Sequence, residues 1–299
     1  MLRWARASLR KPAHPLRASR CCQLSSPAAS QVAVWQLLQE VHASSLDRPA
    51  VVACGESGPR LSHRELRVRS LAFAGRLTRD LGYAAGDKLA LVLGGNCVES
   101  IITQLAAAAA GLIVVTAATA EDTVLEGCRG MVVSSRVLQG RSPLGLLVDE
   151  QHPPIVAHDE SGASTSPLLW QDTLDCTPMD TACAAADHNA LLAVYGGAKA
   201  SEKRQTQGQI THMAARTAAR MRLSDADRVA LGVPLDSPFG FAAGALAGED
   251  AHPSMVVTSS RMRARLQDVS CACVCVCARA HACVVCMRAR ARAHPLLAL

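Results

Sequence analysis

Residues 271–299 hold the densest group of side chains that could do chemistry. Six of the 13 cysteines fall in this stretch, together with His281 and several arginines. Cys283 and Cys286 have the spacing of a zinc-binding pair. The Cys-x-Cys repeat over 271–277 suits a soft-metal cluster, and the arginines would attract nucleic-acid phosphates. One hypothesis is therefore a protein that binds metal or nucleic acid through this tail.

The composition of the same tail supports a simpler interpretation. Alternating Cys-Val and Ala-Arg pairs are what translated dinucleotide repeats encode, and they give no patterned face to bury. A structural zinc site needs two separated ligand pairs, whereas the tail offers one pair at zinc spacing. We therefore predict no metal site, and we predict that 251–299 is a low-complexity Cys/Ala/Arg tail without ordered structure.

The opposite end of the chain has the composition of an organelle-targeting leader. Its basic residues, such as Arg3, Arg6 and Arg10, are interleaved with Leu, Ala and Ser, and the first acidic residue is Glu40. Residues 1–32 therefore indicate a mitochondrial-type transit peptide, and a mitochondrial location is expected. The alternative is a disordered basic arm.

The distribution of charge limits the partners expected for the middle of the chain. The formal net charge is +6, but the last acidic residue is Asp268, so the basic excess lies in the two ends. A basic leader and a basic tail say little about what a folded domain binds, and nucleic acid is not an expected partner. No apolar run reaches the ~18–20 residues that span a bilayer, so no transmembrane segment is predicted.

Between these ends, short apolar runs alternate with helical periodicity. Ser62 and Glu65 form a capping box at the start of a helix that runs to about Gly82. The strands expected at 88–93 and 112–116 flank a helix, so they should be parallel and adjacent. The predicted class is α/β, with a largely parallel sheet covered by helices. We predict a further helix at 34–41, strands at 49–54, 131–134, 144–149, 191–195 and 229–233, and a surface connection over 151–189.

Three segments in this order resemble the opening of adenylate-forming enzymes, and more narrowly of acyl-CoA synthetases of the fatty-acid type. They are LSHREL (61–66), GDKLALVLGGNCVE (86–99) and QLAAAAAGLIVVTA (104–117). Downstream, the strand that ends in Pro234-Leu235 also matches, as does Gly240, although the histidine that the family can place before that glycine is missing. The resemblance implies that residues 33–250 form a partial, incomplete N-terminal AMP-binding domain of this fold.

The resemblance also implies where phosphates would bind. The family has a loop rich in glycine, serine and threonine, then a lysine and a Thr-His pair, and here residues 193–206 are followed by Thr211-His212. The loop departs from the pattern because alanines and Glu202 occupy positions where hydroxyls are usual, which should weaken phosphate binding. The candidate nucleotide-binding residues are Gly196, Gly197, Ser201, Lys203 and Thr206.

The family reaction defines the cofactors and substrate to be expected. By resemblance, the enzyme would use ATP, Mg²⁺ and coenzyme A to convert a carboxylic (fatty) acid into an acyl-adenylate and then a thioester. The family's later Tyr-Gly-x-Thr-Glu and Thr-Gly-Asp motifs and its catalytic lysine are not found in the 299 residues. We therefore expect this chain alone not to complete the reaction, and a non-catalytic remnant or interaction protein is the alternative.

Overall fold

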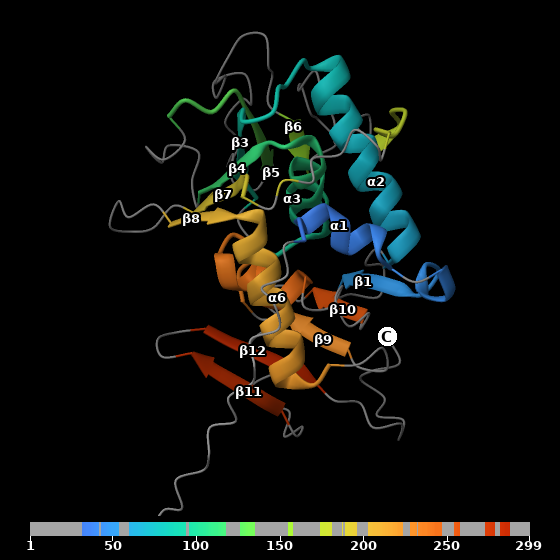
Figure 1. Cartoon of the computed structure of the whole chain (residues 1–299), viewed down its shortest axis with the longest axis vertical. Helices are drawn as coiled ribbons and strands as arrows, with labels where there is room; N and C mark the ends of the chain where they lie inside the picture. Colours follow the sequence, from blue (N-terminus) through green and yellow to red (C-terminus); the bar gives the residue numbers. More distant parts are fainter. Residues whose placement is uncertain are drawn as a thin grey trace, which may run out of the picture.

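A computed structural model describes most of the middle of the chain and three segments beyond residue 250. Two six-stranded sheets form its frame: sheet A has the strand order β11-β12-β9-β10-β1-β2, and sheet B the order β6-β5-β3-β4-β7-β8. Sheet B lies above sheet A in Figure 1, with helices between and beside them. The described residues are 32–41, 43–53, 60–93, 96–117, 126–134, 155–157, 174–180, 187, 189–195, 203–223, 228–231, 233–246, 254–257, 273–278 and 282–287.

Sheet B is parallel except at one edge. Its central strand β3 pairs with β4 and β5 in parallel, and β4 pairs in parallel with β7. The predicted parallel neighbours at 88–93 and 112–116 are thus confirmed. Only β8 runs antiparallel, as the return strand of a hairpin with β7. The strands are β3 (Lys88–Val92), β4 (Ile113–Thr116), β5 (Gly130–Ser134), β6 (Ile155–Ala157), β7 (Leu191–Tyr195) and β8 (Lys203–Thr206).

Sheet A has a parallel centre built from segments that are far apart in the sequence. Strand β10 lies between β9 and β1 and pairs with both in parallel. The hairpin β11–β12 continues the sheet beyond β9, and β2 closes the other edge, both by antiparallel pairing. The strands are β1 (Pro49–Ala53), β2 (Arg60–Ser62), β9 (Arg228–Leu231), β10 (Ser254–Val257), β11 (Cys273–Ala278) and β12 (Ala282–Met287).

The structure differs from the sequence-based prediction in 251–299. Three of its segments are strands of sheet A, so ordered structure extends past the predicted boundary at residue 250. Ser254–Val257 is a short apolar run that lies between β1 and β9. Its backbone pairs with both strands, so their facing N–H and C=O groups have partners. The rest of the tail lies outside the described residues. Residues 1–31 of the predicted leader and the strand predicted at 144–149 also lie outside them.

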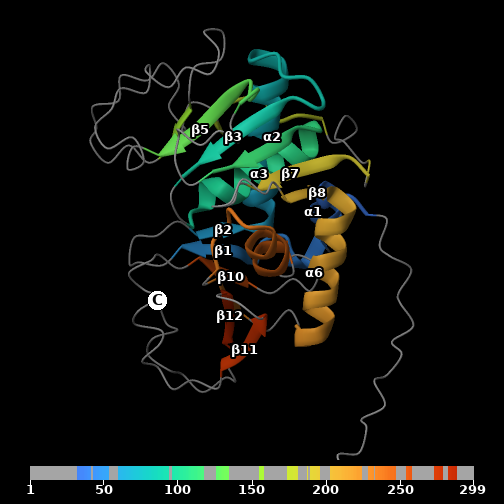
Figure 2. The ribbon, with the colours of Figure 1, turned by 90° about the vertical axis from the view of Figure 1, so that its left-hand side faces the viewer.

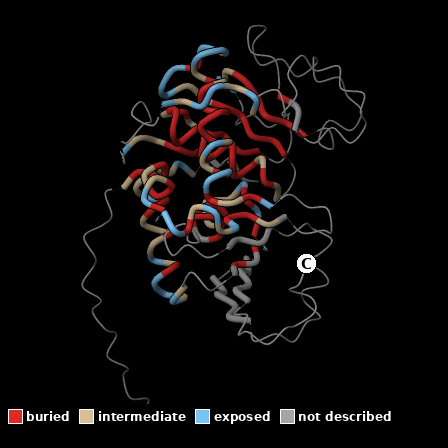
Figure 3. Tube along the Cα trace, turned by 90° about the vertical axis from the view of Figure 1, so that its right-hand side faces the viewer, coloured by how far each residue is buried: buried red, intermediate tan, exposed pale blue. Residues whose placement is uncertain are grey.

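The helices between the sheets carry a shared core. Helix α3 (Val98–Ala110) packs on β3 and β4, α2 (His63–Gly75) contacts β1 and β2, and α1 (Val34–Gln39) contacts α3 and α6 (Gln207–Met221). Figure 2 shows the same arrangement from the side. One cluster of buried side chains includes residues of both sheets. Buried residues are red in Figure 3. The core includes Val51, Leu61, Leu89, Leu105, Val114 and Leu231.

Local signals explain where α2 and α3 begin and end. The Ser62 hydroxyl accepts the Glu65 backbone N–H at 3.2 Å, and the Glu65 carboxylate accepts the Ser62 N–H at 2.8 Å, which confirms the predicted capping box. Helix α2 continues as a π-helical turn, η2 (Arg76–Asp80), before the chain turns at Gly82. Helix α3 ends at Gly111, whose φ of 71° is the left-handed conformation that glycine adopts most easily.

The region predicted as a surface connection, 151–189, contributes more than a loop. It contains β6, and its described part at 174–180 lies against α2, where the Arg79 guanidinium donates to the carbonyls of Thr177 and Pro178. Leu174 and Met179 pack against the core. This segment therefore covers the end of α2 and reduces its exposure to solvent.

Candidate nucleotide and substrate site

Ends of strands from both sheets meet at one place. Ligands of open parallel α/β sheets bind beyond the carboxyl ends of the strands, because the loops there converge and carry polar groups. In sheet B those ends are Leu93 after β3, Thr116 in β4 and Tyr195 in β7. The chain that leaves the carboxyl end of β9 in sheet A reaches the same place, since Thr116 donates to the Asp236 carbonyl at 3.0 Å.

The predicted phosphate loop connects β7 to β8. Tyr195 pairs with Lys203, so residues 196–202 join the two strands. Gly196, Gly197 and Ser201 belong to this connection, which lies outside the described residues. Lys203 begins β8, and Thr206 ends β8 at the start of α6. The five candidate residues thus belong to one hairpin and the helix start that follows it, and their phosphate contacts stay a prediction.

Thr206 has a defined role at the start of α6. Its hydroxyl accepts the Gln209 backbone N–H at 3.2 Å, and the Gln209 side chain accepts the Thr206 N–H at 3.0 Å. This reciprocal capping box satisfies two of the free N–H groups at the helix start. The first turn of α6 has no acidic residue. Thr206 pairs with Leu191 at the start of β7, so the positive end of this helix lies at the amino edge of sheet B, at the opposite end of β8 from residues 196–202.

Gln207 fixes the hairpin and α6 to the rest of the domain. Its side chain is buried, with its amide oxygen accepting the Val34 N–H at the start of α1 and its amide nitrogen donating to the Ala108 carbonyl in the last turn of α3. Each of these helix ends has backbone groups without partners inside the helix. One amide therefore caps two helices. Sequence analysis missed this residue; the available signal was a polar side chain on the apolar face that Ile210, Ala214 and Ala218 mark out.

Thr211, of the predicted Thr-His pair, also has a structural partner. It is buried, and its hydroxyl donates to the Val32 carbonyl at 2.9 Å and lies 3.1 Å from the Gly208 carbonyl. His212, the next residue, is half-buried on the same helix. The Thr211 contact joins α6 to the residues that precede α1. In the described structure this pair therefore contributes a tether through its threonine.

The segment 231–236, which follows β9, is held by side chains from sheet B and α3. The Asn96 amide donates to the carbonyls of Leu231 and Val233, at 3.3 and 2.9 Å, and its oxygen accepts the Leu235 N–H at 2.8 Å. Gln104 donates to the Leu235 carbonyl at 3.3 Å. Asn96 lies within the segment 86–99 that resembles the family, but the sequence assigned it no contact. Its actual partners could not be found from local spacing, because they lie more than 130 positions away.

The segment then turns tightly around Gly240. The Ser237 hydroxyl donates to the Pro234 carbonyl at 2.7 Å and accepts the Gly240 N–H at 3.0 Å. A Cβ atom at residue 240 would overlap the Pro234 carbonyl oxygen. Glycine is therefore required here by close backbone approach, and from it begins the π-helical segment η6 (Gly240–Leu246), which packs on α6 and β9.

Other reactive groups in the described part of the chain are not arranged as a site. Cys128 is buried, and burial raises the pKa of its thiol to about 11. Among the described side chains, no group of three or more His, Cys, Asp or Glu residues could hold a metal ion. The hairpin β11–β12 is described by its backbone alone, so the tail hypothesis of metal or nucleic-acid binding stays a prediction.

No described helix combines the length and the hydropathy required to cross a bilayer.

Comparison with known proteins gives a family match over part of the chain. Residues 38–123 match the model of the family described as AMP-binding enzyme. This range includes α2, β3, α3 and β4, and it stops before the hairpin loop at 196–202. A comparison with curated protein sequences gives no match.

Solved structures with the same fold extend the likeness to most of the chain. A protein from Rhodopseudomonas palustris described as a long-chain-fatty-acid CoA ligase has a TM-score of 0.60 at 23% identity, over 77% of this chain and 58% of its own. A benzoate CoA ligase from Burkholderia xenovorans has a TM-score of 0.65 at 19% identity, over 80% and 48%. The N-terminal domain of FACL13 from Mycobacterium tuberculosis has a TM-score of 0.60 at 18% identity, over 75% and 56%.

These likenesses agree with the order of elements and with the sequence resemblance. The chain spans about half the length of the structures that it matches. At these identities the structural likeness establishes the fold, while the family match establishes the relation over 38–123. The chain thus resembles AMP-binding enzymes over residues 38–123 and has the fold of the N-terminal part of adenylate-forming acyl-CoA ligases.

Proposed function

We propose that this chain provides the nucleotide-binding part of an ATP-dependent carboxylate–CoA ligase. The β7–β8 hairpin carries the proposal, because β7 ends at the carboxyl edge of sheet B and residues 196–202, which match the position of the family's phosphate loop, connect it to β8. The family match and the neighbours with CoA-ligase names support the same class of reaction.

The proposed residues divide the work of holding phosphates. The backbone N–H groups of Gly196 and Gly197 would face phosphate oxygens, and the Ser201 hydroxyl would donate to them, whereas Thr206 lies at the far end of β8 and caps α6. Lys203 would contribute a positive charge at the start of β8. When bound, Mg²⁺ neutralises phosphate charge in such reactions. The role proposed for this chain is thus to orient ATP for attack.

The complete reaction has two transfers. A carboxylate oxygen of the acid forms a bond to the α-phosphorus of ATP, and pyrophosphate leaves with the electrons of the broken P–O bond. The sulfur of coenzyme A then attacks the acyl carbon of the acyl-adenylate, loses its proton to solvent, and AMP leaves. A fatty acid is the substrate class that the sequence resemblance favours, and benzoate is the alternative that one structural neighbour suggests.

A non-catalytic role is the second candidate, and the loop sequence favours it. Ala198 and Ala200 bring no hydroxyl, and the Glu202 carboxylate would repel phosphate. A chain with this loop could keep the fold and serve as a binding partner of a complete relative. The difference between the two candidates is therefore a difference in nucleotide affinity.

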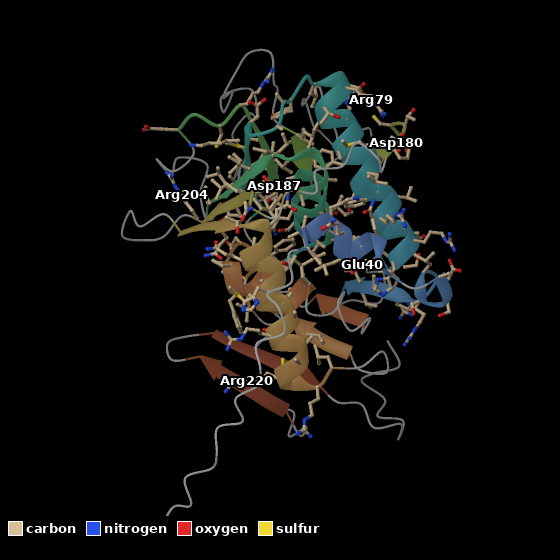
Figure 4. The ribbon with its side chains drawn as sticks, viewed as in Figure 1. Glu40, Arg79, Asp180, Asp187, Arg204 and Arg220 are labelled. Atoms are coloured by element: carbon tan, nitrogen blue, oxygen red, sulfur yellow. The ribbon has the colours of Figure 1, made fainter. Side chains whose placement is uncertain are left out.

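Calorimetric titration of the full chain with ATP and Mg²⁺ tests the choice. We expect saturable binding that weakens about tenfold or more in a Ser201→Ala, Lys203→Ala double variant. The control is Arg220→Ala, an exposed residue near the other end of α6 (Figure 4). No binding by a folded chain would reject the ligase proposal and leave the non-catalytic one. If ATP binds, acid-dependent exchange of labelled pyrophosphate into ATP, with octanoate and with benzoate, identifies the substrate class.

We also propose that residues 1–32 direct the chain to mitochondria. The proposal rests on the arginines and on the absence of acidic residues before Glu40. A fusion of 1–32 to a fluorescent protein should reach mitochondria, and replacing Arg3, Arg6 and Arg10 by glutamine should abolish import. A diffuse signal from the unaltered fusion would reject the address.

A further inference from the structure

The backbone between β9 and the Gly240 turn depends on side chains for its hydrogen bonds. Within 231–236, the carbonyls of Leu231, Val233, Leu235 and Asp236 and the N–H of Leu235 all bond to side chains of Asn96, Gln104 or Thr116. A buried backbone group without a partner costs about as much as a lost hydrogen bond. These three side chains therefore supply partners to backbone groups at the end of β9 and in the chain that follows it.

Asn96 carries most of this tether. Its amide group donates two hydrogen bonds and accepts one, so both donors and the acceptor have partners in one segment. The partners are every second residue, namely Leu231, Val233 and Leu235. Their spacing fixes the direction of the segment as well as its position. Aspartate has nearly the same shape, but an ionised carboxylate accepts only and would face two carbonyl oxygens. The chemistry of the amide, not its volume, is what the geometry requires.

The position of this tether links the two sheets. Asn96 follows β3 of sheet B, whereas 231–236 follows β9 of sheet A. The segment leads into the Ser237 turn and Gly240, and the Leu235 side chain belongs to the shared core. Any change at Asn96 would thus be transmitted to the backbone at the place where the strand ends of both sheets meet.

We propose that Asn96 is a positioning residue that sets the backbone of 231–236 at the candidate site. The tether itself stands on the contacts above. Its effect on ligands rests on the proposed function, together with the assignment of the carboxylic acid to the place where the two sets of strand ends meet. Asn96 would then orient the acid relative to the hairpin at 196–202, while taking no part in the bonds that form or break.

Hydrogen exchange measured by mass spectrometry on the full chain tests the tether without any ligand. In Asn96→Asp at pH 7, we expect the peptide over 231–240 to exchange at least tenfold faster, with the peptides of β3 to β5 changed much less. Lowering the pH to about 5 should reduce this excess exchange rate, after correction for intrinsic exchange. The introduced carboxyl group faces two carbonyl oxygens, which favour its protonated form, and a protonated carboxyl group regains one donor. Asn96→Ser, which keeps one donor and one acceptor, should fall between the wild type and Asn96→Asp.

A matched amide-to-acid change separates positioning from a general loss of stability. At Gln209 the amide oxygen accepts the Thr206 N–H, and a carboxylate would keep that bond at a favourable helix end. Gln209→Glu should therefore leave exchange over 231–240 unchanged. Equal exchange over 231–240 in wild type and Asn96→Asp, or a uniform rise in every peptide without pH dependence, would overturn the proposal. If Asn96→Asp does not fold at pH 7, Asn96→Ser and the pH 5 measurement decide.

Ligand measurements on the same variant distinguish a failure of this proposal from a failure of the proposed function. If ATP binds, Asn96→Asp should leave ATP affinity within about twofold and weaken the response to the acid in pyrophosphate exchange. Equal loss of both would show that Asn96 acts on the whole fold. If ATP does not bind at all, the exchange data still decide whether Asn96 holds the segment.

Discussion

The Gln207 amide oxygen accepts the Val34 backbone N–H at 3.0 Å, across 173 positions of sequence. The same side chain donates to Ala108 at the end of α3, so three helices meet at one buried amide. Because Gln207 directly follows β8, this contact also anchors the end of the β7–β8 hairpin that leads into α6.

Replacing Gln207 by alanine should destabilise the domain by roughly 1–3 kcal/mol, because two buried helix-end groups lose their partner. Gln207→Glu should be at least as harmful, since it keeps the acceptor but loses the donor and buries a charge. Urea unfolding followed by circular dichroism measures both. Gln209→Ala is the control, because its capping bond is exposed and its loss should be smaller. Equal losses at 207 and 209 would contradict the role given to the buried amide.

Thr206 provides a second test, in which capping and phosphate contact can be separated. Thr206→Ala should cost about 1 kcal/mol of stability, the usual loss for an N-cap hydroxyl. Thr206→Ser keeps the hydroxyl and should remain close to wild type in both stability and ATP titration. A serine variant as unstable as the alanine variant would show that the methyl group, and not the capping bond, matters.

Gly240→Ala should be strongly destabilising. The added Cβ would overlap the Pro234 carbonyl, which is backbone and cannot move without disturbing the Ser237 turn. Overpacking of this kind costs ~1–3 kcal/mol, or more where the backbone must shift. Thermal unfolding of purified variants measures the loss. A variant with the wild-type midpoint would show that the turn relaxes freely.

The capping box of α2 predicts a dependence of stability on pH. The Ser62 backbone N–H bond to the Glu65 carboxylate lowers the pKa of that carboxyl group in the folded chain. A lowered folded pKa adds stability above the unfolded pKa, and that stability is lost as the pH falls through the folded pKa. Wild type should therefore exceed Glu65→Gln in unfolding midpoint near pH 6 to 7, and the two should converge below pH 4. The difference should be small because Glu65 is exposed.

Cysteine labelling distinguishes a buried thiol from a half-exposed one. Cys128 has a pKa raised to about 11 by burial, so at pH 8 about one thiol in a thousand is ionised. Cys176 is half-exposed beside Asp80. Iodoacetamide should modify Cys176 well before Cys128 in the native chain, and denaturation should remove the difference. Peptide mapping by mass spectrometry gives both rates, and equal native rates would contradict the placement of Cys128.

The elements with strong local signals were predictable from sequence. The capping box of Ser62 and Glu65, the strand–helix–strand unit around α3 and the strands at 131–134, 191–195 and 229–233 are all present within one or two residues. Their apolar runs and periodicity reflect burial, which is why a single sequence reveals them. The helix between the strands at 88–93 and 112–116 also indicated that they are parallel, because parallel neighbours need such a crossover.

The elements that were missed lack such signals. Strand β8 is the polar sequence Lys-Arg-Gln-Thr, and it forms because the β7 backbone needs a partner. Strand β10 is four residues long, in a region where composition suggested no order. The tethers of Asn96 and Gln207 join positions that only the tertiary fold brings together. For the candidate site, sequence indicated the hairpin residues, whereas the groups that hold the surrounding backbone needed the structure.

The place of β10 in sheet A has a consequence for the order of synthesis. Strand β1 ends at Ala53, but the strand that pairs with it in parallel begins at Ser254. At ~5–20 residues per second, a ribosome needs roughly 10–40 s to make the intervening chain. Throughout that time, the strand that pairs with one side of β1 in the finished sheet has not yet been made. An unpaired strand edge is a place where other chains can pair. The nascent chain therefore carries this open strand edge until almost the whole domain has been made.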